Sequence, residues 1–145
     1  MLLTVDIGNT NITFGLYEGD LLKAHWRIRT IHEKMADEYG VLLEQLFHHR
    51  GFRLDVVDGV AVASVVPPLT PVFADICREY WGRGPLIVDV GVRTGVRVRV
   101  DNPRELGADR VVDAAAVYRL HGGPACVVDF GTATSFDAIS RVGDY

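Results

Sequence analysis

One short pattern occurs twice in this chain: an apolar run, an aspartate, an apolar residue, a glycine and then small polar residues. It reads VDIGNTN at Val5–Asn11 and VDFGTAT at Val128–Thr134, an offset of 123 residues. Each copy continues into a second apolar run and a Gly-Asp pair, which is one residue out of step between the copies. Because aspartate and glycine are common turn residues, a single copy would indicate only a hairpin turn. The duplication predicts two related hairpins that form the floor of a cleft.

The residue types in the repeat suit phosphate binding. Glycine lets the backbone approach an anion closely, and consecutive turn amides can form an anion-binding nest. Carboxylates at the strand ends, here Asp6 and Asp129, can hold a cation that neutralises phosphate charge. The chain has neither G-x-x-x-x-G-K nor G-x-G-x-x-G, so the pattern is neither a Walker A loop nor a dinucleotide fingerprint.

Hydrophobic periodicity predicts an α/β fold with a mixed sheet. Two hairpins come first, and strands then alternate with helices. The predicted helices cover residues 33–49, 70–81 (with Thr70 as N-cap and Pro71 at the first helical position) and 108–121. The predicted strands cover residues 2–6, 11–17, 21–29, 56–66, 86–90, 96–100, 125–130 and 135–140.

Composition narrows the class of protein. A net charge of −4 gives no indication of nucleic-acid binding, and no apolar run is long enough to span a bilayer. The two cysteines, Cys77 and Cys126, have no CxxC partner, so we expect both to be core thiols in a reducing cytoplasm.

A third segment, NPRELGADR at Asn102–Arg110, precedes the alanine-rich helix, and ASVVPPL stands at Ala63–Leu69. Together with DIGNTN and DFGTATSFD, these segments closely resemble type III pantothenate kinases of the acetate and sugar kinase/Hsp70/actin superfamily. The resemblance runs from Leu3 to about Ser140. It implies a ribonuclease H-like mixed β-sheet with flanking helices, which is the first domain of a duplicated actin-like fold, plus the start of the second.

The resemblance also implies an activity. Members of the family phosphorylate pantothenate to 4'-phosphopantothenate with ATP and Mg²⁺, the first step of coenzyme A biosynthesis. A monovalent cation, K⁺ or NH₄⁺, is a further cofactor, and the enzyme is a cytoplasmic homodimer with no nucleic-acid or membrane partner. Carried over by motif, the ATP-binding residues are Asp6, Ile7, Gly8, Asn9, Thr10, Asn11, Ile12, Thr13 and Thr132. The pantothenate-binding residues are Gly107, Ala108, Asp109 and Arg110. Asp109 is the implied general base, Asp129 the monovalent-cation ligand, and Asp6 lies near the magnesium through the phosphates.

Several of these residues have a simpler interpretation. Asp109 could be a carboxylate favoured by a helix N-terminus, and Asp6 and Asp129 could simply initiate turns. Arg110 could pair with a substrate anion or with Asp109, or it could be solvated. Asp113 stands where the family usually has asparagine, and adds a negative charge one helical turn from Asp109.

The two parts of the duplication are unequal in length. We expect a first domain at residues 1–121 and the start of a second at residues 122–145. A second copy of the fold would require roughly 100 residues after Tyr145, and the 145-residue chain alone is therefore expected to have little activity.

Two other functions are compatible with the sequence. Some proteins of this family are accessory factors to a transcription regulator, although Asp6, Asp109 and Asp129 are all intact here. The chain could also belong to another small-molecule kinase or phosphohydrolase of the superfamily, against which the GADR segment argues.

Overall fold

The N-terminal hairpin predicted from the repeat is present. In the computed structural model, which describes residues 1–89 and 91–145, strand β1 (Leu2–Ile7) pairs antiparallel with β2 (Asn11–Glu18). Strand β3 (Leu21–Arg29) then pairs antiparallel with β2. Side chains alternate along β1, so that Leu3, Val5 and Ile7 are buried while Leu2 and Asp6 are exposed on the opposite face.

Two parallel strands extend this hairpin into a mixed sheet. Strand β4 (Gly59–Ser64) pairs with β1, and β5 (Leu86–Ile87) pairs with β4. The order across the sheet is β3-β2-β1-β4-β5. The predicted mixed α/β architecture is thus confirmed. Of the strand predicted over residues 86–90, only the first two residues pair, and Val90 lies outside the described residues.

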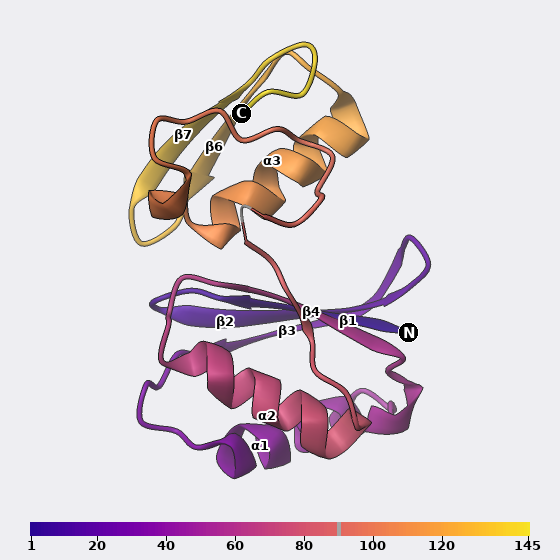
Figure 1. Ribbon diagram of the computed structural model, residues 1–145. Helices are drawn as coiled ribbons and strands as arrows, with labels where there is room; N and C mark the ends of the chain where they lie inside the picture. The colour runs from indigo at the N-terminus through magenta and orange to yellow at the C-terminus, as the bar shows by residue number, and fades with distance from the viewer. Residues whose placement is uncertain (90) are drawn as a thin grey trace. The chain divides into compact units, whose positions relative to one another are not determined.

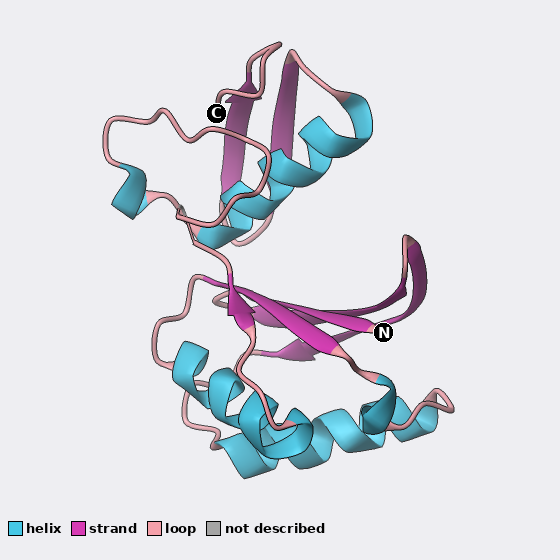
Figure 2. Cartoon of the chain, turned by 45° about the vertical axis from the view of Figure 1, so that its right-hand side comes forward, coloured by secondary structure: helices cyan, strands magenta, loops and turns pink. Residues whose placement is uncertain are grey.

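Helices α1 (Ala36–His49) and α2 (Leu69–Trp81) cover one face of this sheet (Figures 1 and 2). The core lies between them and the sheet. Its aromatic members pack closely: the Trp26 and Phe47 rings stack with centroids 4.8 Å apart, and Tyr39 meets Phe73 at 5.2 Å. A short 3-10 turn, η1 (Leu54–Val56), precedes β4, which is shorter at both ends than the strand predicted over residues 56–66.

The helix starts differ from prediction. Helix α1 begins at Ala36, three residues later than expected, and its N-cap Met35 donates its N–H to Glu38 Oε2 (2.9 Å). Helix α2 begins at Leu69, so the prediction that Thr70 is its N-cap was wrong. The hydroxyl of Thr70 donates instead to Ser64 Oγ (3.0 Å), which ties the helix start to the end of β4.

The C-terminal part of the chain is a helix packed on a hairpin (Figure 1). A 3-10 turn, η2 (Pro103–Glu105), precedes α3 (Ala108–His121), and β6 (Ala125–Phe130) pairs antiparallel with β7 (Thr134–Ile139). Both strands and the helix agree with prediction to within one residue.

Residues 96–100 do not form the predicted strand. Arg97 and Arg99 are exposed and the intervening valine is half-buried, as the alternation predicted. A strand also requires a partner along its length. Here the backbones of Arg97 and Arg99 bond to Gly143 and Tyr145, and the pairing is a single bridge between Arg97 and Asp144. The two arginines also form ion pairs with Asp144.

The chain divides into two units, Met1–Ile87 and Val88–Tyr145. The boundary near His121, predicted for the domains of the complete fold, stays a prediction. Cys77 is buried as expected, and burial raises the pKa of its thiol to about 11. Cys126 is exposed on the face of β6 that α3 does not cover, so its prediction as a core thiol was wrong. Among the described helices, none combines the length and apolarity that crossing a membrane requires.

Candidate phosphate loops and substrate segment

The first glycine turn, Gly8–Thr10, connects β1 to β2. The Gly8 N–H donates to the carbonyl of Asn11 (3.0 Å), which closes the turn. A Cβ at Gly8 would lie 3.1 Å from that same carbonyl oxygen, closer than most real Cβ contacts. The tight turn therefore favours glycine at this position.

The predicted ATP-binding residues differ in their exposure. Ile7 and Ile12 are fully buried, so only their backbone could contact a nucleotide. Asp6, Asn9, Thr10 and Asn11 have exposed side chains. Asp6 lies directly across from the half-buried Thr13 in the β1–β2 register, which places a carboxylate and a hydroxyl side chain next to each other at the mouth of the turn.

The second turn, Gly131–Ala133, is similar but one residue shorter when counted between paired residues: Phe130 pairs with Thr134, whereas Ile7 pairs with Ile12. Its glycine N–H donates to Ala133 O (3.0 Å), two residues further on, whereas Gly8 donates to Asn11, three residues further on. Asp129 lies opposite Ser135, just as Asp6 lies opposite Thr13. Asp129 and Thr132 are exposed. The structural match supports the duplication inferred from sequence.

The GADR segment forms the start of α3. Gly107 is the N-cap residue and makes no side-chain cap, and Asp109 stands in the first turn. The half-buried Asp109 accepts the backbone N–H of Arg110 at Oδ1 (2.8 Å). That contact agrees with a helix-terminal carboxylate. It engages one carboxylate oxygen and leaves the other for a substrate hydroxyl, so both interpretations of Asp109 are compatible with the geometry.

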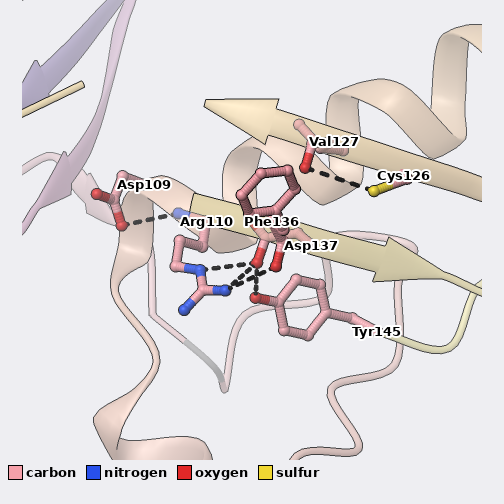
Figure 3. Close-up of polar contacts among 7 residues, drawn as sticks. All are labelled: Asp109, Arg110, Cys126, Val127, Phe136, Asp137 and Tyr145. Atoms are coloured by element: carbon pink, nitrogen blue, oxygen red, sulfur yellow. Dashed lines mark hydrogen bonds and ion pairs between the residues drawn. The ribbon is translucent and has the colours of Figure 1, made fainter. Parts of the chain in front are cut away.

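Arg110 pairs with Asp137 on β7, a partner that the sequence did not indicate (Figure 3). Its Nε donates to Asp137 Oδ1 (2.7 Å), and Nη2 contacts the same oxygen and the carbonyl of Phe136 (3.3 Å). Tyr145 also donates its hydroxyl to Asp137 Oδ1. The Asp137 side chain is only 1% exposed against 39% for Arg110. Asp137 thus engages both Nε and Nη2 of the guanidinium.

Burial and neighbouring charges shift several pKa values here. The hydrogen bond to Asp137 raises the pKa of Arg110, which stays charged. Burial, followed by the bond to Asp137, raises the pKa of Tyr145 to about 12. The pKa of Asp113 is raised, first by burial and then by repulsion from Asp129, Asp109 and Asp137. This part of the chain thus concentrates negative charge.

Across residues 1–89 and 91–145, no three acidic, histidine or cysteine side chains come together as a ready-made metal site. Mg²⁺ is commonly held by one or two carboxylates, with phosphate oxygens and water completing its shell. The exposed strand-end carboxylates Asp6 and Asp129 fit that kind of partial site, because each offers hard oxygen ligands beside a glycine turn.

The chain is an α/β protein with two glycine turns, each next to a strand-end carboxylate, which is the pattern expected of a phosphate-binding protein. A family model described as type III pantothenate kinase matches residues 2–145, and the chain belongs to this family. It is 54% identical over 145 residues to the type III pantothenate kinase of Moorella thermoacetica, and 50% identical to that of Roseiflexus castenholzii. Each alignment covers 100% of this chain and 57% of the relative, so the chain spans little more than half the length of these relatives.

One solved structure also resembles the chain. It is a candidate N-acetylglucosamine kinase from Porphyromonas gingivalis, 15% identical, with a TM-score of 0.44 over 60% of this chain and 32% of that one. A likeness this weak supports no conclusion about the present chain.

Sequence reasoning missed three polar residues around these loops. Asp137 is the buried partner of Arg110, Ser135 lies opposite Asp129, and Thr30 donates two hydrogen bonds to the first turn. The repeat did not indicate Ser135, because at the offset of 123 residues Thr13 falls against Phe136. Thr30 and Asp137 make contacts at sequence separations of 20 or more, which local patterns do not reveal.

Proposed function

We propose that the complete protein carrying this sequence transfers a phosphoryl group from ATP to pantothenate, giving 4'-phosphopantothenate for coenzyme A biosynthesis. The observation that carries the proposal is family membership across residues 2–145, with the GADR segment intact at the start of α3. Curated relatives about 50% identical bear the name type III pantothenate kinase.

The first turn would bind ATP phosphates through residues 6–13, and Thr132 of the second turn would add a contact. Support comes from the glycine turns, whose backbone can approach an anion, and from the exposed polar side chains around them. Phosphoryl transfer depends mainly on positioning and on neutralising charge, so backbone amides and one or two cations suffice for much of the catalysis.

Asp6 would lie near Mg²⁺ through the phosphates, and Asp129 would hold K⁺ or NH₄⁺. When bound, these cations neutralise the negative charge of the phosphates. Each carboxylate is exposed at the end of a strand, and each has a hydroxyl residue opposite it in register.

Gly107–Arg110 would hold pantothenate, with Asp109 as general base. A carboxylate within hydrogen-bond reach of the substrate hydroxyl can accept its proton as the new O–P bond forms. Arg110, fixed by Asp137, offers Nη1 to an anionic group of the substrate. We also propose that the enzyme is a cytoplasmic homodimer with no nucleic-acid or membrane partner, on the strength of the family resemblance.

The test is ADP release by the complete protein, measured with MgATP in the presence and absence of pantothenate. Release that depends on pantothenate supports the proposal. Release only with other acceptors would show a different small-molecule kinase, and no release with any acceptor would show a non-catalytic member of the family. Repeating the assay with K⁺ replaced by Na⁺ tests the monovalent cation separately.

A further inference from the structure

The first turn is held from outside by one residue, Thr30, which directly follows β3. Its backbone N–H donates to Thr10 O (3.0 Å), and its hydroxyl donates to Gly8 O (2.6 Å). The first and last residues of the turn are therefore both bonded to Thr30. Only 9% of Thr30 is exposed, so water competes little for these bonds.

Thr30 is itself fixed by the core. The next residue, Ile31, donates its N–H to the hydroxyl oxygen of Tyr39 (3.0 Å), and its carbonyl accepts a hydrogen bond from the same hydroxyl (2.9 Å). Tyr39 is fully buried in α1 and packs on Phe73 of α2. A continuous set of contacts thus runs from the helical layer through Ile31 and Thr30 to the turn.

These bonds determine which way the turn amides point. In a planar trans peptide unit, the C=O and N–H groups point in opposite directions. Gly8 O shares its peptide unit with the N–H of Asn9, and Thr10 O shares its unit with the N–H of Asn11. Because Thr30 holds both carbonyls, both of these N–H groups are directed away from Thr30.

We propose that Thr30 is a positioning residue for ATP: by binding Gly8 O and Thr10 O, it orients the Asn9 and Asn11 amides toward the phosphates. This inference rests on the proposed function, because it requires that the first turn binds ATP. Orientation before binding removes an ordering cost that the ligand would otherwise bear.

The chain offers a matched control in the same sheet. Thr4 of β1 donates its hydroxyl to Gly15 O (3.2 Å), the same type of bond at a site away from the turn. Thr30→Val and Thr4→Val each remove one hydroxyl-to-carbonyl bond and keep the branched shape. A general loss of stability should therefore be similar in the two variants, while an effect on the turn should be confined to Thr30→Val.

The experiment measures the MgATP dissociation constant, the KM for pantothenate and the urea midpoint in the complete protein. Thr30→Val is expected to weaken ATP binding about 2- to 12-fold, the factor that corresponds to one lost hydrogen bond, with the pantothenate KM unchanged. Thr4→Val should bind ATP as the unsubstituted protein does. Thr30→Ser keeps the hydroxyl and should restore most of the affinity.

The outcomes separate the two proposals. If the unsubstituted protein does not bind ATP, the proposed function fails and this inference fails with it. If it binds ATP but Thr30→Val retains full affinity, or weakens no more than Thr4→Val, only the inference is overturned. Should Thr30→Val not fold, Tyr39→Phe provides the test: it releases Ile31 and is expected to weaken ATP binding, and unchanged affinity would overturn the positioning role.

Discussion

The guanidinium of Arg110 is bound to the buried carboxylate of Asp137, 27 residues further along the chain. The contact joins the first turn of α3 to β7, the return strand of the second glycine turn. The segment proposed to hold pantothenate is therefore fixed to the hairpin proposed to contact ATP and the monovalent cation. A shift of one would displace the other.

We expect the two sides of this ion pair to respond unequally to substitution. Arg110→Gln leaves the Asp137 carboxylate buried without its cation, and should lower the free energy of unfolding by about 3 kcal/mol. Asp137→Asn leaves a guanidinium that is 39% exposed and can be hydrated, so the loss should be about 1 kcal/mol. Urea denaturation measures both. As a control, Arg78→Gln breaks the exposed pair with Asp75 and should cost no more than about 0.5 kcal/mol. Equal losses at Arg110 and Asp137 would contradict this account.

Asp113→Asn should stabilise the protein at neutral pH. The pKa of Asp113 is raised in the folded state by burial and by three nearby carboxylates. The folded protein then binds more protons at this site than the unfolded chain, so wild-type stability falls as pH rises through the folded-state pKa. The variant lacks this titration. Its advantage should be largest at pH 7 and should disappear below the ordinary carboxyl pKa. Unfolding free energies measured at several pH values test this, and an advantage that grows with acidity would contradict it.

Asp109→Asn should separate chemistry from binding. If Asp109 accepts the hydroxyl proton, its loss should reduce kcat by about 10²- to 10⁴-fold, while the ATP dissociation constant changes little. Asparagine preserves the size of the side chain and can still accept the Arg110 N–H. Asp75→Asn on α2 serves as a control carboxylate and should retain full activity. A normal kcat for Asp109→Asn would leave only the helix-terminal interpretation.

Gly131→Ala should disturb the monovalent-cation requirement. A Cβ at this position would lie 3.1 Å from Asp129 Oδ2, so the carboxylate proposed to bind K⁺ would have to move. The K⁺ concentration for half-maximal activity should therefore rise. Gly91→Ala is a close control, because its Cβ would lie at the same 3.1 Å from Asp89 Oδ1 in another Asp-x-Gly sequence. An unchanged K⁺ dependence in Gly131→Ala would remove Asp129 from its proposed role.

Local patterns predicted most of the elements but not all of their ends. The alternation of β1 and β2 and the glycine turn between them were visible because each depends on neighbours in sequence. The apparent N-cap Thr70 misled because Ser64, six residues earlier, offered its hydroxyl a partner. Residues 96–100 misled for a related reason: their alternation describes exposure correctly, but pairing depends on a partner strand.

The candidate site shows the same difference between local patterns and contacts of distant residues. The sequence by itself determined the two Asp-x-Gly turns, the GADR segment at a helix start and the family to which the chain belongs. Only the tertiary structure decided what holds these parts: Thr30 on the first turn and Asp137 on Arg110. Turns and helix starts arise from dihedral preferences of adjacent residues, whereas a hydrogen bond or ion pair between distant residues exists only after the core has brought them together.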